Sequence, residues 1–210
     1  MTETGTQHVT NAVCTAVKSK TDVHQKIKDI TLKALTQHQL DKDAIKTVAD
    51  AVGQGIHQGI ADQDELAKDL FMHAVTALDN ALAISAEASM LALEEAAANV
   101  ADYSRHDLNE AINDLKDRES LFFDTLENIA KSGNQRIAGI IDDFISHARR
   151  SGTAVGEQTL IALDALKDLP TISKDIIVSG AVATTSTLAQ IGSGILLGIA
   201  ESLQPGHAEK

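Results

Sequence analysis

Residues 71–100 read FMHAVTALDNALAISAEASMLALEEAAANV, and this stretch decides the fold. Phe71, Val75 and Leu78 begin an apolar series with spacings of four and three residues, and the series returns every eleven residues. Such spacings place side chains on one face of an α-helix. The stretch therefore predicts a long amphipathic helix with an eleven-residue apolar period.

The same register continues to Leu166, and the positions reached from Phe71, Val75 and Leu78 in steps of eleven are termed the seam. Of its 27 positions, 21 are apolar and only Glu119 is charged, in a chain that is 43% hydrophobic. An apolar face this long needs a partner, so we predict that it is a surface for self-association or for contact with a hydrophobic body. Its large members are Phe71, Val75, Leu78, Leu82, Leu93, Val100, Leu108, Leu115, Phe122, Leu126, Ile137, Ile141 and Phe144.

An eleven-residue period over three turns lies close to the relaxed helix, so the seam predicts a nearly straight or slightly right-handed coiled coil. Residues 66–130 are predicted to form one continuous helix, with breaks at residues 131–134 (KSGN) and 151–156 (SGTAVG). The equal alternative is a set of ordinary bundle helices whose separate stripes happen to align. Either way, the helices must fold back on one another or associate with further copies of the chain.

The fold class predicted is all-α, as a helical bundle or an antiparallel helical assembly. Both prolines, Pro170 and Pro205, lie near the end of the chain, and aromatic residues make up only 2% of it. One helix is expected to begin at Thr21 or Asp22, and the next near Asp41. The predicted regions are a poorly ordered N-terminus (1–20) with at most a short helix over residues 9–17, N-terminal helices ending in a Gly-rich helix (21–61), a long acidic amphipathic segment (62–169), an apolar Gly/Ser/Thr-rich helix (170–204) and a tail (205–210).

A short motif occurs twice: residues 53–62 (GQGIHQGIAD) and 192–201 (GSGILLGIAE) share the pattern G-x-G-I-x-x-G-I-A-[DE]. Within helices, the glycine pairs Gly55/Gly59 and Gly194/Gly198 form ridges without side chains, which allow close helix packing. We expect these two segments to pack against neighbouring helices, in the simplest arrangement against each other. A phosphate-binding loop is the weaker interpretation, because neither copy has the lysine of such loops.

The net charge is −12, and the acidic residues concentrate in residues 62–168. Such a field repels phosphate backbones, so we expect no nucleic-acid partner. No two of the eight histidines lie three or four residues apart, and Cys14 is the only cysteine. Helical metal sites and thiol catalysis need such constellations, so we expect no enzyme, no metal and no cofactor.

Residues 176–200 form a stretch without charged residues that is long enough to cross a bilayer, although Ser, Thr, Gln and Gly are frequent in it. A buried or surface-lying helix is the favoured interpretation, and a membrane anchor is the alternative. The first residues lack the basic and apolar parts of a secretory signal, so a cytoplasmic location is expected, with granule or membrane association as an addition.

The Ala-rich, aromatic-poor stretch from about residue 66 to 169 resembles the phasin-like bacterial proteins, or another family of Ala-rich helical bacterial proteins. The resemblance covers about half of the chain and implies a coat on polyhydroxyalkanoate granules. We therefore expect a non-enzymatic helical coat or structural protein that self-associates and binds a neutral hydrophobic surface. The alternatives are a soluble homo-oligomeric adaptor for a protein that the sequence does not identify, and a membrane-attached protein anchored by residues 176–200.

Overall fold

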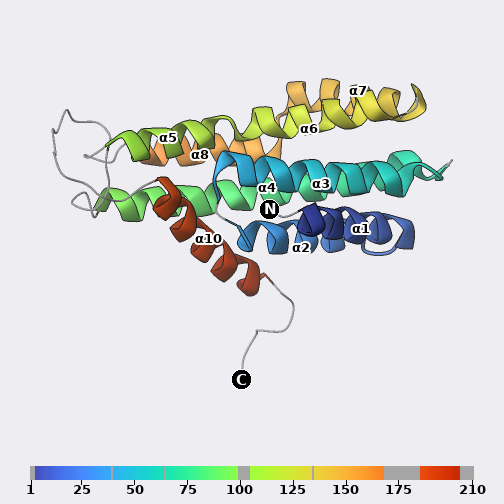
Figure 1. Ribbon diagram of the computed structural model, residues 1–210. Coiled ribbons are helices and arrows are strands. Elements are labelled where there is room, and N and C mark those ends of the chain that lie inside the picture. The colour runs from blue at the N-terminus through green and yellow to red at the C-terminus, as the bar shows by residue number, and fades with distance from the viewer. Residues whose placement is uncertain are drawn as a thin grey trace.

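A computed structural model describes residues 3–38, 40–63, 65–98, 105–133, 135–167 and 185–203 of the chain (Figure 1). The predicted tail (205–210) and the first part of the predicted C-terminal region lie outside these residues. The helices are α1 Glu3–Ser19, α2 Val23–Thr36, α3 Lys42–Ile60, α4 Ala67–Ala98, α5 Arg105–Lys116, α6 Arg118–Ser132, α7 Gln135–Ser151, α8 Ala154–Lys167 and α10 Thr185–Ser202.

Helix α4 is the central element of the bundle. Its 32 residues extend for about 48 Å at the usual helical rise. It contacts α2, α3, α5, α6, α7, α8 and α10. In Figure 1, α5 and α6 follow one another along one side of the molecule, α1 and α2 lie on the opposite side, and α10 crosses the bundle obliquely.

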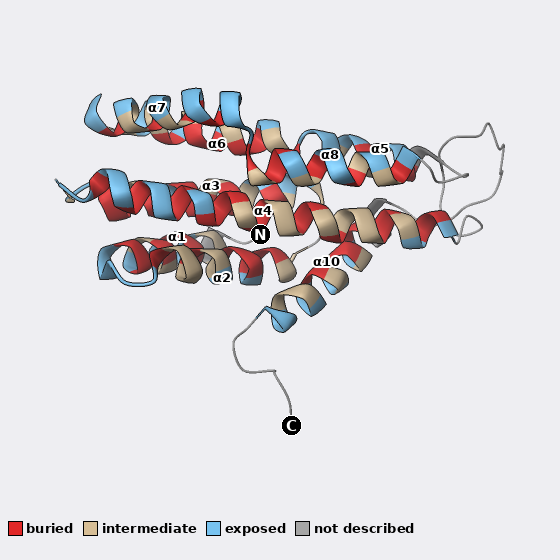
Figure 2. Cartoon of the chain, turned by 180° about the vertical axis from the view of Figure 1, so that it is seen from behind, coloured by how far each residue is buried: buried red, intermediate tan, exposed pale blue. Residues whose placement is uncertain are grey.

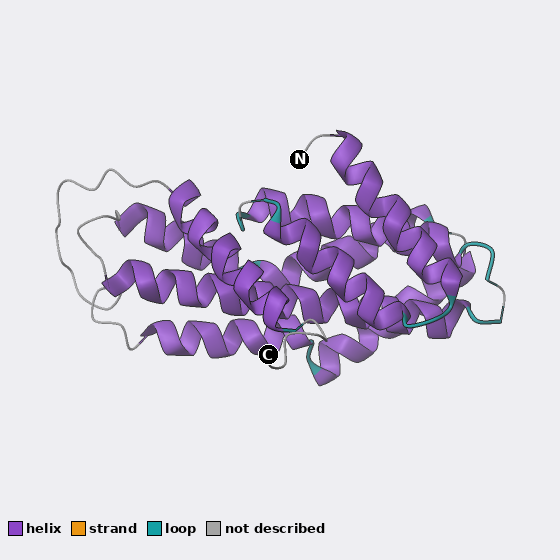
Figure 3. Cartoon of the chain, turned by 90° about the horizontal axis from the view of Figure 1, so that it is seen from below, coloured by secondary structure: helices purple, strands orange, loops and turns teal. Residues whose placement is uncertain are grey.

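The all-α prediction is confirmed, and the described residues contain no strand (Figure 3). The helix predicted near Asp41 begins there, because the Asp41 carboxylate accepts a hydrogen bond from the backbone N–H of Ala44 at 2.8 Å. Both predicted breaks are also present. Helix α6 ends at Ser132, and α7 and α8 are separated by Gly152, whose φ of +84° favours glycine.

The prediction of one continuous helix over residues 66–130 is wrong. Helix α4 ends at Ala98, α5 packs back on α4, and Asp117 separates α5 from α6. Folding back lets the apolar stripes of successive helices cover one another within one chain. Figure 2 shows the result, with buried residues on the helix faces that look inward and exposed residues on the outer faces.

The prediction of a poorly ordered N-terminus over residues 1–20 is also wrong. Helix α1 occupies most of this region and buries Val9, Val13 and Val17 against the rest of the bundle. These valines recur every four residues and so share one face of the helix. What stabilises α1 is its contact with α3, a long-range feature that its own weak pattern does not reveal.

Candidate functional site

The seam lies inside the bundle. Of its thirteen large residues, Phe144 is half-buried, Val100 lies outside the described residues, and all the others are buried. Across the whole described seam, only Gly152 is exposed. One buried cluster joins α1–α4, α6 and α7, and a second lies mainly between α4, α5 and α8. The predicted contact surface is therefore the intramolecular core of the folded chain.

The four phenylalanines meet at one place in this core. Phe144 of α7 makes edge-to-face contacts with Phe71 of α4 and Phe122 of α6, with ring centroids 6.0 and 6.3 Å apart. Phe123 lies beside Phe122 at 5.7 Å. Such pairs add to the stability that burial provides. The few aromatic side chains therefore act as packing residues that tie α4, α6 and α7 together.

The first copy of the glycine motif is occupied. A β-carbon placed on Gly55 would lie 2.6 Å from the carbonyl oxygen of Thr10, and one on Gly59 would lie 2.5 Å from the Val17 β-carbon. Helix α1 thus approaches the backbone of α3 more closely than it could if residues 55 and 59 carried side chains. The hydroxyl of Thr10 donates a hydrogen bond to the Ala51 carbonyl at 3.0 Å, which adds a polar contact to the same interface.

The second copy is open. Nothing in the described structure lies within 4 Å of a β-carbon placed on Gly194 or Gly198. The prediction of close packing is thus met at Gly55 and Gly59 and not at the second pair, and the two motifs do not pack on each other. Helix α10 instead contacts α4, α2 and α5 through its other face, where Leu188 and Leu196 are buried.

Two hydrogen bonds hold α10 in this orientation. The backbone N–H of Leu40 donates to the Ala189 carbonyl at 3.1 Å, and the Ser193 hydroxyl donates to the His38 carbonyl. A β-carbon placed on Gly192 would lie 3.3 Å from the Cδ1 atom of Leu40, so this glycine lies against the Leu40 side chain. The loop between α2 and α3 therefore fixes which face of α10 is buried, and the face with Gly194 and Gly198 is left outward.

The outward face adjoins a groove of about 540 Å³ between α2 and α10. Leu197 overhangs this groove with 46% of its surface exposed. Leu203, directly after α10, is exposed to the same extent, and on α8 the exposed fractions are 71% for Leu160 and 52% for Ile161. Leu66 and Met72 are exposed as well, by 44% and 37%, so large apolar side chains meet water at several places on this acidic molecule.

A buried cation is the most unusual polar feature. Arg118, the first residue of α6, has 2% of its surface exposed. Its guanidinium donates hydrogen bonds to the hydroxyls of Ser85 at 2.7 Å and Ser89 at 3.1 Å, both on α4. The Ser85 hydroxyl in turn donates to the Leu82 carbonyl. The polar seam position Ser89 thus serves to satisfy Arg118.

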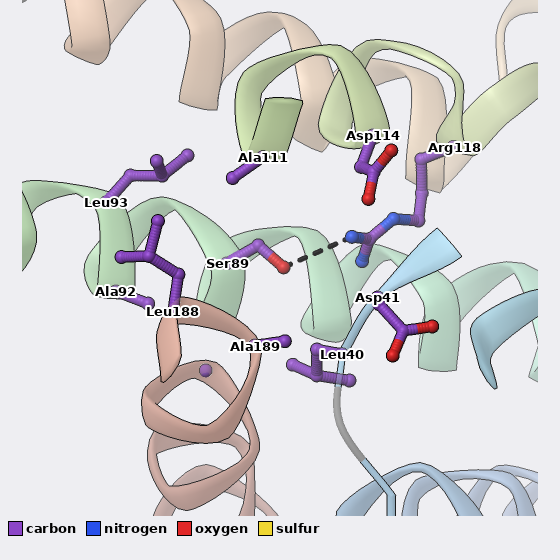
Figure 4. A pocket seen from close by; sticks show the side chains of 11 residues that line it. Leu40, Asp41, Ser89, Ala92, Leu93, Ala111, Asp114, Arg118, Leu188 and Ala189 are labelled. Carbon is purple, nitrogen blue, oxygen red and sulfur yellow. Dashed lines mark hydrogen bonds between the residues drawn. The ribbon is translucent and has the colours of Figure 1, made fainter. Parts of the chain in front are cut away.

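A small pocket of about 20 Å³ adjoins this guanidinium, with space for one water molecule (Figure 4). Asp114 and Asp41 also line it. Burial lowers the pKa of Arg118 to about 10, while the nearby Asp114 charge opposes that shift, so Arg118 stays protonated at neutral pH. Burial raises the pKa of Asp114, against the lowering effects of the Lys42 N–H and Arg118. The pocket lies where α4, α5, α6, α10 and the start of α3 meet, and it is too small for a metabolite.

A second polar layer lies where α8 begins. The buried Asp79 carboxylate accepts hydrogen bonds from the backbone N–H groups of Ala154 and Val155, both at 2.9 Å. Glu119 accepts a hydrogen bond from the Thr153 hydroxyl at 2.6 Å, so the one charged seam position pairs with the N-terminal end of α8. Burial raises the pKa of Asp79, the two backbone hydrogen bonds lower it, and the Glu119 charge raises it further. This layer fixes the register of α4, α6 and α8.

The described residues contain no group of three or more His, Cys, Asp or Glu side chains placed to hold a metal ion. His24 of α2 shares a hydrogen bond with Asn80 of α4 at 3.0 Å, and burial lowers its pKa, as do the charges of Lys28 and His73. Cys14 is half-buried on α1. The His24–Asn80 hydrogen bond connects α2 to α4.

Sequence reasoning missed Arg118 and Asp79. Both are charged residues within helical segments, where solvent exposure is the usual outcome. The available signal was the pair of serines at positions 85 and 89, which are spaced for one helix face and interrupt an apolar stretch. For Asp79 the signal was weaker, because its partners are backbone groups 75 and 76 residues away in the chain.

No helix among the described residues has the length and apolar character required to cross a bilayer. Residues 176–184 of the predicted apolar stretch lie outside the described part.

Comparison with known proteins places the chain in one family. A family model described as a family of unknown function, DUF6781, matches residues 1–205, so the chain belongs to that family. No curated protein and no solved structure matches the chain significantly.

Proposed function

For this member of DUF6781, we propose that the protein is a non-enzymatic helical scaffold that self-associates through exposed apolar side chains on α8 and at the end of α10. The seam residues are buried in the core of the chain, so contact with another molecule requires a different surface. The observation that carries the proposal is the exposure of Leu160, Ile161, Leu197 and Leu203 on α8 and at the end of α10. Covering these side chains in an assembly of like copies removes apolar surface from water.

The charge of the chain sets the conditions for assembly. Each copy has a net charge of −12, so two copies repel one another at low ionic strength. Salt screens this repulsion and leaves burial of apolar surface in place. Self-association of this kind therefore strengthens as salt is added, whereas association by opposite charges weakens.

Sedimentation equilibrium of the full chain at several salt concentrations tests the proposal. The expected result is a discrete dimer or larger closed oligomer whose dissociation constant falls as salt increases. A monomer at every concentration and every ionic strength contradicts the proposal. Light scattering during gel filtration is an independent measurement of the same mass.

A second candidate function is a coat on a neutral hydrophobic surface such as a polyhydroxyalkanoate granule. Supporting it, the long helix α4 fills much of the core with alanine, which includes the buried residues Ala74, Ala81, Ala88 and Ala96. Shallow Ala contacts bury less surface than Leu contacts, so the cost of exchanging helix partners for a polymer surface is lower. In this version the bundle opens along the seam.

Flotation with polyhydroxybutyrate granules and with triolein droplets separates the two candidates. A coat protein partitions with the particles, and its α4 amides change their hydrogen-exchange protection on binding. A scaffold of closed bundles stays in the aqueous fraction and keeps the same protection. The second candidate is withdrawn if a folded oligomer fails to partition with either particle.

A further inference from the structure

We propose that the surface groove between α3 and α6 binds an extended peptide segment that carries a basic side chain. The two helices run side by side in the same direction (Figure 1), and Lys42 with Asp117 and Asp50 with Thr125 meet at the same offset of 75 residues. The space between them, termed the α3–α6 groove, has two adjoining parts of about 400 and 240 Å³. No residue of α8 or α10 lines either part, so this inference does not depend on the proposed self-association.

The floor of the groove lies where the two helices approach most closely. A β-carbon placed on Gly53 would lie 3.0 Å from side-chain carbons of Thr125 and Ile129, both of which are buried. Thr125 has 2% of its surface exposed and lines both parts of the groove. Its hydroxyl donates across the groove to the Asp50 carboxylate at 3.5 Å, which is longer than an ordinary O–H···O bond. A ligand that accepts this hydroxyl at normal distance therefore gains a buried hydrogen bond.

The walls of the larger part are polar and neutral. Gln54 and Gln58 of α3 and Asn128 and Ser132 of α6 line it and are exposed. Amide side chains both donate and accept hydrogen bonds, which matches the N–H and C=O groups of a peptide main chain. A helix already pairs those groups internally, so an extended segment is the form that can offer them to the walls.

The lining also disfavours a docked helix. A helix that enters a groove places apolar anchors in it, and none of the exposed residues in the described lining is apolar. From Lys42 to Gln58, the groove follows α3 for about 24 Å at the usual helical rise. An extended chain rises about 3.3 Å per residue, so the groove accommodates about seven residues.

Charge favours a basic peptide. Lys42 and Lys46 line the smaller part and pair with the carboxylates of Asp117 and Asp50. Asp124 is exposed in the same part and forms an ion pair with neither lysine. The chain as a whole has a net charge of −12, which attracts basic segments and repels acidic ones. The Asp124 carboxylate is therefore the expected contact of the basic side chain.

Selection from a library of random octapeptides displayed on phage tests the groove, with the full chain as the immobilised target. Peptides enriched over a target-free control are synthesised, and their dissociation constants are measured by fluorescence anisotropy. Asn128→Trp fills the groove from one wall, and Asn113→Trp, at an exposed position of α5 outside the groove, is the matched control. We expect Asn128→Trp to raise the dissociation constant about tenfold or more, and Asn113→Trp to leave it unchanged.

Charge reversal tests the basic contact. Asp124→Lys is expected to weaken binding of an enriched peptide severalfold, and to have no such effect when the basic residue of that peptide is replaced by norleucine. Asp143→Lys, at an exposed position of α7, makes the same charge change outside the groove and is the control. Equal losses with both peptides contradict the contact at Asp124.

Three results overturn the groove as a peptide site. They are a selection without enrichment, enriched peptides that bind Asn128→Trp as tightly as the wild type, and transferred nuclear Overhauser effects that show a helical bound peptide. If Asn128→Trp loses its helical circular-dichroism signal, Gln54→Ala replaces it, with the exposed Gln190→Ala on α10 as control. A monomeric wild type that binds the enriched peptides supports the groove and contradicts self-association alone.

Discussion

Helices α3 and α10 carry the same glycine motif and differ in what covers it. In α3 the ridge lies under Val13 and Val17 of α1, and in α10 no atom of the described residues lies within 4 Å of a β-carbon placed on Gly194 or Gly198. The motif provides a flat strip of backbone that another helix can approach, and this property is local. Which helix arrives depends on the rest of the molecule. A helix sequence can therefore provide a surface suited to close packing without determining which helix packs on it.

The largest expected difference comes from alanine in the occupied copy. Gly55→Ala and Gly59→Ala each push a methyl group into α1, and at Gly55 the obstacle is the backbone oxygen of Thr10. We expect each to lower the free energy of unfolding by about 1–3 kcal/mol, measured by urea denaturation. Gly139→Ala is the control, because it adds the same methyl in open space. Stabilisation at Gly55 similar to that at Gly139 contradicts the close contact.

A double substitution sharpens this result by testing the partner directly. The β-carbon of Gly59→Ala would lie against Val17, so shortening that valine makes room for it. In a cycle of Gly59→Ala, Val17→Ala and the double variant, we expect a favourable coupling of about 1–2 kcal/mol. Additive effects in urea denaturation are inconsistent with the predicted contact between these two positions.

The open copy is expected to respond with the opposite sign. Gly194→Ala and Gly198→Ala each remove a glycine from a helix interior, and the added methyl group meets no atom of the described part of the chain within 4 Å. Each should raise the free energy of unfolding of the monomer by about 0.5–1 kcal/mol, through helix propensity. Thermal and urea denaturation at low protein concentration measure this. Destabilisation in dilute monomer means that a segment of the same chain already covers the ridge.

The smallest expected effect is a pH dependence, which distinguishes the α8 junction from α10. Burial raises the pKa of Asp79 above the 3.8 of an unperturbed aspartate, so the native chain binds this proton at higher pH than the unfolded chain does. The stability that this carboxyl contributes therefore increases as the pH falls through the raised pKa, and it is lost as the pH rises.

Asp79→Asn isolates the contribution of that carboxyl. The free energy of unfolding of the wild type, minus that of the variant, should grow on acidification from neutral pH towards 3.8. Gly194→Ala is the matched comparison, because α10 has no ionisable side chain near that position, and its difference from wild type should stay constant with pH. A difference for Asp79→Asn that shrinks on acidification contradicts the assigned direction.

The sequence predicts where helices begin and end better than it predicts which buried polar residues contact one another. The start of α3 at Asp41 and the breaks around Gly133 and Gly152 follow from short-range signals, namely caps and glycines. The spacing of Ser85 and Ser89 marks a polar spot on α4, but it does not identify Arg118 as their partner, because Arg118 lies 33 and 29 residues later in the chain. A charge inside a bundle is tolerated only when partners converge on it, and no local pattern encodes that convergence.

By itself, the sequence determined that this chain is helical, which face of each helix is apolar, and where two helices have backbones bare enough for close contact. These properties come from side-chain periodicity and glycine content within one helix, so they follow from the sequence of that helix alone. The tertiary structure alone decided that the seam closes on itself, that α1 covers the first glycine ridge, and that the second stays outward. Those outcomes depend on which distant apolar faces bury the most surface together, a property of the whole chain.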